Sequence, residues 1–453
     1  MLRQDGIKNV HGANLAQIGG LATSEQHMFD ARYRIGYRPA MAHTFTHEQL
    51  LDRYAELVVR SGLNVKAGQQ VVISAPLEAV HLVWRITRHA YQAGATLVTT
   101  LYSDEAATLT RYEVGAEASF DAAPGWLFNG MAEAFRNGAA RLAIIGENPA
   151  LLSGQNPEHV SRANKARSIA YKPAIELITT SAVNWCVISC ATPAHARSVF
   201  PDLPEAEALA ALWKAIFTCT RADVPDPVAA WKAHSARLKE KTNFLNARRY
   251  SALRYKGPGT DFTLGLVDGH IWKGGASLAR NGVTFNANIP TEEVFTMPHR
   301  ERADGWVTAT KPLSYGGTFI DGIRVRFEKG RIVEAHAGQG LDVFAKMIDS
   351  DEGASRLGEV ALVPHSSPVA ASGIIFNETL FDENAACHIA VGQCYSTNLD
   401  GAERLSKDEL LARGANQSII HVDWMIGSGE IDIDGVLTDG RSEPLMRNGE
   451  WAA

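Results

Sequence analysis

The sequence predicts an α/β N-terminal domain built on a parallel sheet, followed by an α+β C-terminal domain rich in antiparallel strands. Three observations support this prediction. Short apolar runs alternate with helical segments in the first half, turn-punctuated strands fill the second half, and a Gly-Pro-Gly turn at 257–259 separates the two patterns. Alternating strands and helices are typical of a parallel sheet covered by helices, whereas short strands joined by turns are typical of antiparallel sheets.

Size and composition indicate a soluble, multi-domain protein. The 453 residues are 45% hydrophobic and 21% charged, which is ordinary globular usage. The 44 basic and 50 acidic residues give a formal net charge of −6, so no long-range attraction draws the chain to nucleic acid or anionic lipid. No apolar stretch approaches the roughly 20 residues of a membrane span. We therefore expect neither a nucleic-acid nor a membrane partner.

Residues 1–43 are expected to form a flexible N-terminal extension, because they show no clear hydrophobic period. Their apolar run is too short for a signal peptide, and Asp5 lies where a basic segment is required. A transit peptide is the less favoured alternative. The five cysteines, a small and odd number, argue against a disulfide framework and favour a reducing compartment. None of them forms a C-x-x-C pair, which argues against a zinc ribbon or a thioredoxin-type site. The expected location is therefore the cytoplasm.

The predicted N-terminal domain covers residues 44–256. It begins with a helix, HEQLLDRYAELVVRSGL, that Thr46 can cap. Four buried strands are predicted by apolar runs at 69–76, 96–104, 141–148 and 183–190, with helices between them. Neither G-x-G-x-x-G nor G-x-x-x-x-G-K follows any of these strands, so the domain is Rossmann-like in architecture without a recognisable nucleotide site.

The predicted C-terminal domain covers residues 257–453 and follows a long charged helix at 226–248. It holds an unusual density of carboxylates and histidines beside apolar strand residues. These lie in PTEEVF (290–295), GEVALVP (358–364), FDENAACHIAVGQCY (381–395) and IIHVDWMIG (419–427).

His421 and Asp423 lie two residues apart in the apolar run IIHVDWMI. In a strand, residues i and i+2 point to the same face, so the imidazole and the carboxylate should converge. A lone buried carboxylate is costly unless it is paired or binds a metal. The pair is thus either a structural hydrogen bond or part of a metal site.

The segment FDENAACHIAVGQCY predicts a helix from Ala385 to Tyr395, capped by the acidic residues before it. On that helix His388 and Tyr395, seven residues apart, share a face. Glu383 reaches the same site only from the loop that enters the helix. Taken alone, His388 is as well explained by a core histidine, and Tyr395 by a packed aromatic.

Glu292 and Glu293 are adjacent in a strand-like segment, so at most one of them faces a common site. Glu359 begins another apolar strand. Oxygen ligands with a minority of imidazoles suit divalent ions such as zinc, cobalt or manganese. Because up to six ligands exceed the needs of one tetrahedral ion, the set favours two metals that share a bridging carboxylate.

At these residues the sequence resembles the M29 family of metallo-aminopeptidases, of the thermophilic or aminopeptidase S/T type. The similarity extends from about Thr44 to Trp451. It is densest in NIPTEEVFTMPHR, ATKPLSYGG, DEGASRLGEVALVP, TLFDENAACHIAVGQCY and HVDWMIG. The first 43 residues look like an extension that the family usually lacks.

The resemblance implies a function and a set of site residues. The family's metal ligands would fall on Glu293, Glu359, His388, His421 and Asp423, with Glu383 as a further ligand. Glu359 would bridge the ions, and the family's active-site tyrosine matches Tyr395. The implied reaction is removal of N-terminal residues from short peptides with a free N-terminus. In it Tyr395 stabilises the oxyanion, and Glu293 or Glu359 is the general base. The family also implies a homodimer whose active sites face an enclosed cavity.

Two other functions compete with this one. His388, His421 and Asp423 alone form the two-histidine-one-carboxylate set of mononuclear Fe(II) oxygenases, and ring-cleaving dioxygenases use it on a related fold. Glu293 and Glu359 have no role in such a site. A non-enzymatic peptide-binding protein would keep the cavity and lose the metals. Arg300, Lys311 and His299 are either contacts for a substrate carboxylate or surface charges.

Overall fold

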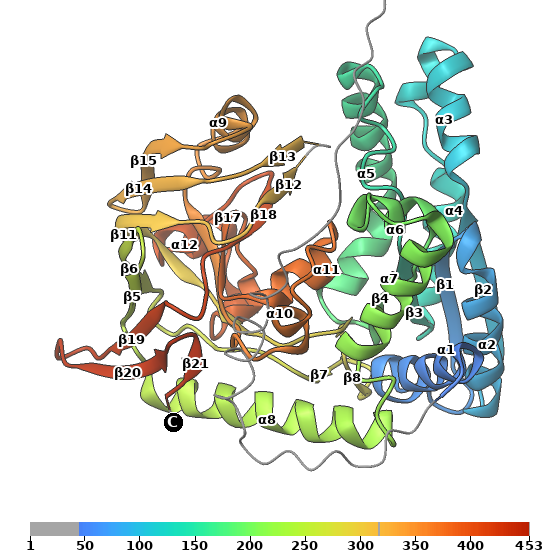
Figure 1. Ribbon diagram of the computed structural model, residues 1–453, viewed down its shortest axis with the longest axis horizontal. Helices are drawn as coiled ribbons and strands as arrows, with labels where there is room; N and C mark the ends of the chain where they lie inside the picture. The colour runs from blue at the N-terminus through green and yellow to red at the C-terminus, as the bar shows by residue number, and fades with distance from the viewer. Residues whose placement is uncertain (1–44, 316–317, 453) are drawn as a thin grey trace, which may run out of the picture. The chain divides into compact units, whose positions relative to one another are not determined.

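The computed structural model describes residues 45–315 and 318–452, so the predicted extension at 1–43 lies outside the described residues. The N-terminal half of this region is built on a parallel sheet (Figure 1). Its strands lie in the order β2-β1-β3-β4, and all three pairings are parallel. The strands are β1 (Gln70–Pro76), β2 (Leu97–Ser103), β3 (Ala140–Ile145) and β4 (Trp185–Ser189). The helices are α1 (His47–Leu57), α2 (Val80–Gln92), α3 (Glu105–Val114), α4 (Gly125–Arg136), α5 (Pro157–Thr179), α6 (Pro193–Val199), α7 (Glu205–Cys219) and α8 (Pro227–Arg248).

Local sequence explains where these elements begin. Thr46 caps α1 by accepting a hydrogen bond from the Gln49 backbone, and the Gln49 side chain accepts one from the Thr46 backbone. The apolar face of α1, with Leu51, Tyr54 and Leu57, is buried. All four strands predicted for this half are present, which confirms the expected parallel α/β architecture.

The C-terminal half contains two larger antiparallel sheets, as predicted. One has eight strands in the order β15-β14-β11-β6-β5-β19-β20-β21, and the other has four in the order β10-β16-β17-β18. The strands of the eight-stranded sheet are β5 (Ala252–Gly257), β6 (Thr260–Leu266), β11 (Pro298–Thr308), β14 (Arg324–Glu328), β15 (Arg331–His336), β19 (Asp432–Val436), β20 (Ser442–Arg447) and β21 (Glu450–Trp451). Those of the four-stranded sheet are β10 (Val294–Thr296), β16 (Leu357–Leu362), β17 (His388–Gly392) and β18 (His421–Met425).

Short hairpins and helices complete this half. The paired strands are β7 (Ser277–Leu278) with β8 (Thr284–Phe285), and β12 (Leu313–Tyr315) with β13 (Thr318–Ile320). The helices are α9 (Leu341–Ile348), α10 (Pro368–Ser372), α11 (Thr379–Asp382) and α12 (Lys407–Ala412).

Two elements connect the halves. β9 (Asn288–Ile289) pairs in parallel with β4 and so adds a fifth strand to the first sheet, shortly before β10 begins in the four-stranded sheet. Helix α8 runs beneath both halves in Figure 1, and it places Trp231 in one hydrophobic core and Leu238 and Leu245 in the other. The 257–259 turn joins β5 to β6 within one hairpin. The division into domains at 44–256 and 257–453 stays a prediction.

The helix predicted from Ala385 to Tyr395 is wrong. Residues 383–385 form a short 3₁₀ turn, and the next regular element is the strand β17. β17 lies between β16 and β18 and is buried along its whole length. A strand buried on both faces reads as a continuous apolar run, which periodicity alone does not separate from a buried helix.

Among the described residues, no helix is both long and apolar enough to cross a membrane. All five cysteines are buried and free of disulfide bonds.

Candidate metal centre

Five of the predicted ligands converge because three strands, and the residue just before a fourth strand, present them from one face of a sheet. In the β16–β17 pair Ala361 lies opposite His388, and Glu359 lies opposite Ala390. In the β17–β18 pair Ala390 lies opposite Asp423, and Gly392 lies opposite His421. Opposed residues share a face, so Glu359, His388, His421 and Asp423 all point the same way.

Glu293 joins this face from the position directly before the neighbouring strand β10. Phe295 of β10 lies opposite Ala361, and Glu293 precedes Phe295 by two positions. The alternate positions of the sheet point into the hydrophobic core instead, among them Val294, Val360, Ile389, Val422 and Trp424.

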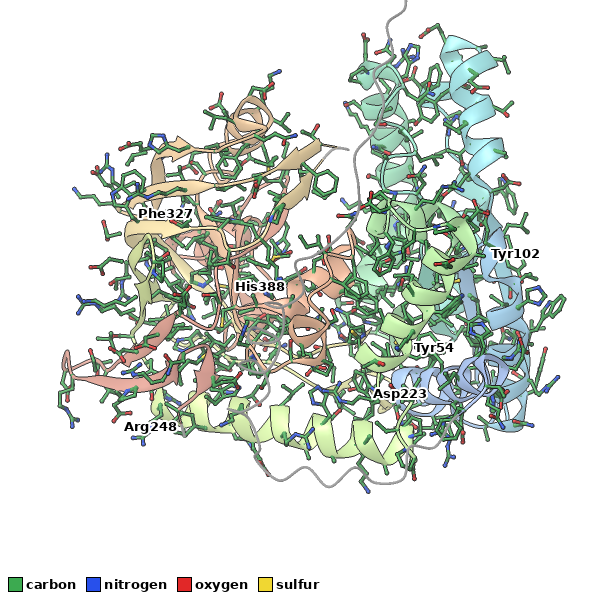
Figure 2. The ribbon with its side chains drawn as sticks, in the orientation of Figure 1. Tyr54, Tyr102, Asp223, Arg248, Phe327 and His388 are labelled. Carbon is green, nitrogen blue, oxygen red and sulfur yellow. The ribbon has the colours of Figure 1, made fainter. Side chains whose placement is uncertain are left out.

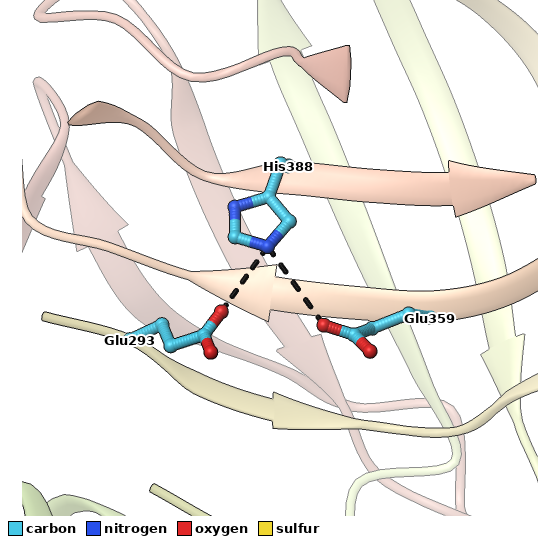
Figure 3. Close-up of side chains that lie close together, drawn as sticks. All are labelled: Glu293, Glu359 and His388. Carbon is cyan, nitrogen blue, oxygen red and sulfur yellow. Dashed lines mark ion pairs between the residues drawn. The ribbon is translucent and has the colours of Figure 1, made fainter. Parts of the chain in front are cut away.

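The side chains of this face are close enough to share an ion. Among the described residues, Glu293, Glu359 and His388 form a buried group whose ligand atoms all lie within 4.8 Å of one another. The His388 Nε2 atom lies 3.1 Å from Glu293 Oε2 and 3.8 Å from Glu359 Oε1. Dashed lines mark these two ion pairs in Figure 3. The His388 side chain is buried and lies within the C-terminal half (Figure 2).

The second histidine extends the group on the other side of Glu359. His421 Nε2 lies 3.4 Å from Asp423 Oδ2 and 3.8 Å from Glu359 Oε2. The two carboxylate oxygens of Glu359 therefore face different histidines.

Both imidazoles are oriented by backbone carbonyls. The Nδ1 atom of His388 lies 3.1 Å from the Ala386 oxygen, and that of His421 lies 2.7 Å from the Gln393 oxygen. A carbonyl only accepts, so Nδ1 carries the proton that it donates, and Nε2 faces the carboxylates. Metal-bound histidines are commonly held in this way, with the second ring nitrogen bonded to a backbone carbonyl.

The electrostatics of the cluster show how tightly these groups are coupled. Burial raises the pKa of Glu359 to about 7, and the Asp423 and Glu293 carboxylates add to this effect while His388 opposes it. Burial would lower the pKa of His421, but the Asp423 and Glu359 carboxylates beside it raise that pKa to about 9. Burial would also lower the pKa of His388, but Glu293 first and then Glu359 and Asp423 raise that pKa well above its usual value. The pKa of Asp423 is lowered by His421 although burial acts in the opposite direction.

The chemistry of these donors fits a divalent metal. Three buried oxygens make no hydrogen bond within the described part of the chain, namely Glu293 Oε2, Glu359 Oε2 and Asp423 Oδ1. Buried polar atoms are normally satisfied, so this concentration of carboxylate oxygens at one place is compatible with a shared cation. Carboxylate oxygens with imidazole nitrogens are ligands typical of zinc, cobalt and manganese.

Glu383 and Tyr395 lie beside this group. Burial and the carboxylates of Glu293 and Asp423 raise the pKa of Glu383 well above its usual value, which places Glu383 in the electrostatic field of the cluster. Glu383 lies on the 3₁₀ turn that precedes the strand β17, and not in a loop that enters a helix. The Tyr395 ring packs against His421, with 4.9 Å between the ring centroids.

Several sequence-based expectations are answered by the surrounding contacts. Glu292 points away from the site and pairs with Arg221 at 2.5 Å, as the strand alternation predicted. Arg300 is buried and donates to both carboxylate oxygens of Glu352, at 2.7 and 2.6 Å, so it is a structural charge. The carbonyls of Ala386 and Gln393 were missed, because a backbone group leaves no signal in the residue type.

Comparison with known proteins agrees with this geometry. The family described as "Thermophilic metalloprotease (M29)" matches residues 47–451. The chain is 53% identical to "Aminopeptidase T" of Thermus thermophilus over 401 residues, which is 88% of this chain and 98% of that protein. It is 47% identical to "Aminopeptidase 2" of Geobacillus stearothermophilus over 405 residues, 89% of this chain and 98% of that protein.

A solved structure gives the same result at the level of the fold. The structure titled "Wild-type AmpT from Thermus thermophilus" superposes with a TM-score of 0.86 at 51% identity, covering 90% of this chain and 100% of that chain. These findings confirm the resemblance inferred from the motifs, and with it the prediction of a metallo-aminopeptidase type of hydrolase. The chain therefore belongs to the M29 family of thermophilic metalloproteases.

Proposed function

We propose that this protein is an aminopeptidase that releases N-terminal residues from short peptides, with two divalent metal ions that share Glu359. One observation carries the proposal. Glu359 Oε1 faces His388 and Glu359 Oε2 faces His421, each at 3.8 Å, so a single carboxylate lies between two sets of ligands. A bridging carboxylate of this kind is typical of two-metal hydrolytic sites.

The ligand sets follow from the nearest contacts. Glu293 and His388 would hold one ion with Glu359, and His421 and Asp423 would hold the other. Glu383 would complete the shell as a further ligand. Zn²⁺, Co²⁺ and Mn²⁺ all suit these donors. When bound, such ions polarise a carbonyl and lower the pKa of a water from 15.7 to about 7.

Side chains of the protein would accept the proton of the attacking water and stabilise the negative charge that develops during hydrolysis. Glu293 or Glu359 would accept the proton of the attacking water, since both carboxylates face the cluster. The Tyr395 hydroxyl would donate a hydrogen bond to the developing oxyanion. Burial and then the nearby carboxylates raise the pKa of Tyr395, so this hydroxyl keeps its proton at neutral pH.

The substrate, the assembly and the location belong to the same proposal. The relatives named above are aminopeptidases, which supports peptide substrates with a free N-terminus. A homodimer that encloses the active sites would limit access to short peptides. The five free, buried cysteines support a cytoplasmic location.

The alternative functions have less support. A mononuclear Fe(II) dioxygenase would use His388, His421 and Asp423. Two further carboxylates, Glu293 and Glu359, lie 3.1 and 3.8 Å from His388 Nε2, and neither has a role in a mononuclear site. None of the relatives named above is a dioxygenase. A peptide-binding protein without metal would leave the cluster of buried carboxylates uncompensated.

The test is metal removal followed by an activity assay. The protein is dialysed against a chelator, and hydrolysis of leucine-p-nitroanilide is measured before and after addition of Co²⁺ or Zn²⁺. We expect activity to disappear with the metal and to return on its addition. Activity that survives complete removal of metal would overturn the proposal.

A further inference from the structure

Behind the candidate metal centre, a buried asparagine joins the two segments that carry Glu293 and Glu383. The Asn384 side chain is fully buried. Its Oδ1 accepts a hydrogen bond from the Glu292 backbone N–H at 2.6 Å, and its Nδ2 donates to the Leu380 carbonyl at 2.8 Å. A backbone N–H only donates and a carbonyl only accepts, so these two contacts fix the orientation of the amide. One side chain thus connects the backbone beside both predicted ligands.

A second contact holds the same segment through the side chain of Glu292. The Glu292 carboxylate accepts two hydrogen bonds from Arg221, from Nη1 at 2.5 Å and from Nη2 at 2.9 Å. Arg221 follows α7 in the N-terminal half, and the Glu292 side chain is only 4% exposed. The neighbouring Thr291 carbonyl accepts a hydrogen bond from His234 Nε2 at 2.7 Å. A two-point Arg–carboxylate pair fixes direction as well as distance.

These contacts are made by residues directly beside the predicted ligands, so they hold the backbone that carries those ligands. Glu292 directly precedes Glu293, and its side chain points to the opposite face. Asn384 directly follows Glu383, and its own carbonyl accepts a hydrogen bond from the Ser367 hydroxyl at 2.9 Å. A shift of the Glu292 or Asn384 backbone would therefore move a ligand of the cluster. Groups outside the ligand shell commonly change metal affinity by about tenfold to a hundredfold.

From this arrangement we infer that Asn384 and the Arg221–Glu292 pair are positioning residues, which hold Glu293 and Glu383 at the separation that the metal centre requires. The inference rests on the proposed metal-dependent function. It also assigns the N-terminal half a role, because Arg221 of that half holds Glu292, the residue before Glu293.

The test is a metal titration that does not depend on activity. Metal-free protein is titrated with Co²⁺ and followed by visible absorption and calorimetry, for the unsubstituted chain and for Asn384→Ala and Arg221→Lys. Asn184→Ala is the matched control. Asn184 is also fully buried, and its Nδ2 donates to the Leu63 carbonyl at 2.6 Å, but it lies in the N-terminal half beside the parallel sheet. Urea unfolding of each metal-free protein separates loss of stability from loss of affinity.

We expect Asn384→Ala to weaken Co²⁺ binding about tenfold or more. Arg221→Lys should weaken binding to a smaller extent, since lysine keeps the charge but loses the two-point contact. Asn184→Ala should lower stability and leave the affinity within about twofold. If Asn384→Ala fails to fold, the Co²⁺ affinity of Arg221→Lys tests the inference alone. Affinities in the folded site variants that match the Asn184→Ala control would overturn the inference. Absence of Co²⁺ binding by the unsubstituted chain would instead overturn the proposed function.

Discussion

Glu359 contributes one carboxylate oxygen to each side of the cluster, so the substitution Glu359→Ala removes a contact from both histidines at once. We expect Glu359→Ala to abolish turnover and to reduce the bound metal below two ions per chain. The fold should persist, because the alanine relieves crowding among buried carboxylates. Metal content and far-ultraviolet circular dichroism check both points, with Glu430→Ala as an exposed control. Near-normal turnover in Glu359→Ala would exclude a bridging role.

Tyr395 provides a second prediction at the scale of one residue. Its ring packs edge-on against Phe295 at 6.2 Å between centroids and also against His421, and these packing contacts do not involve the hydroxyl. Tyr395→Phe should therefore keep the packing and remove only the hydrogen-bond donor. Loss of one oxyanion donor typically costs about 3–4 kcal/mol, so kcat should fall about 10²- to 10³-fold while KM changes little. Steady-state kinetics check this, and an unchanged kcat would contradict the proposed role.

Glu378 predicts a pH dependence of stability that is separate from the metal centre. Its side chain is 11% exposed and accepts a hydrogen bond from the Ser189 hydroxyl at 3.0 Å. Burial raises the pKa of Glu378 from 4.5 to about 8, against the hydrogen bond from Ser189 and with added repulsion from the Asp382 and Glu147 carboxylates. The folded protein thus favours the protonated form. The contribution of protonated Glu378 to the free energy of unfolding is complete below pH 4.5, and it is lost as the pH rises through about 8.

Glu378→Gln should remove this dependence. At pH 5 the variant and the unsubstituted protein should have similar free energies of unfolding, and at pH 9 the variant should be more stable. One pKa unit corresponds to about 1.4 kcal/mol, so the difference should grow by about 2–4 kcal/mol between these values. Urea unfolding across the pH series is the measurement, and Glu403→Gln at an exposed position is the control. A constant difference across the series would contradict the prediction.

At the scale of the element, the four-stranded sheet separates ligands from core by simple alternation. Small residues occupy the ligand face between the ligands, and Ala390 lies opposite both Glu359 and Asp423 in the neighbouring strands. The adjacent Ile389 points into the hydrophobic core. One face of β17 therefore contributes to the candidate metal centre and the other to the hydrophobic core. Substitutions on the first face should change metal affinity, and those on the second should change stability.

Ala390→Val should disturb the metal centre, because it adds two carbons between Glu359 and Asp423. Overpacking of this kind costs about 1–3 kcal/mol, so metal affinity should fall about tenfold. Ile389→Val, which removes one methylene from the other face, should cost about 0.5–1.5 kcal/mol of stability and leave metal affinity unchanged. Metal titration and urea unfolding of both variants check the pair. Equal metal affinity in the two variants would contradict the assignment of faces.

The strands β17 and β18 show which parts of the candidate site can be predicted from the sequence. The β18 pair His421 and Asp423 was placed correctly, because a strand with polar residues at i and i+2 has a clear period. The sequence predicts a helix at His388, because the acidic residues before it suit a helix cap and the IAVG run after it is apolar, which hides the period when both faces are buried. The predicted element is wrong, and the role of His388 as a ligand stays a prediction. Only pairing with β16 and β18 decides that the segment is extended.

At the scale of the whole molecule, the proposed homodimer and its enclosed cavity predict the range of substrates. Light scattering should give the mass of two chains. Short peptides should be hydrolysed and a folded protein with an accessible N-terminus should not, because a folded domain cannot enter an enclosed cavity. A peptide of the same N-terminal sequence is the control for the folded protein. A monomeric mass, or equal rates on both substrates, would contradict the proposal.

The sequence by itself determined the fold class, the M29 family and the residue types of the candidate metal centre that we propose. These properties follow from local information, namely hydrophobic period, turn residues and long ordered motifs. The tertiary structure decided what depends on pairing between distant segments. It set Glu359 between His388 and His421, turned both Nε2 atoms toward the carboxylates, and brought Arg221 against Glu292. Strand register and backbone carbonyls determine these relations, and neither is encoded in the identity of a single residue.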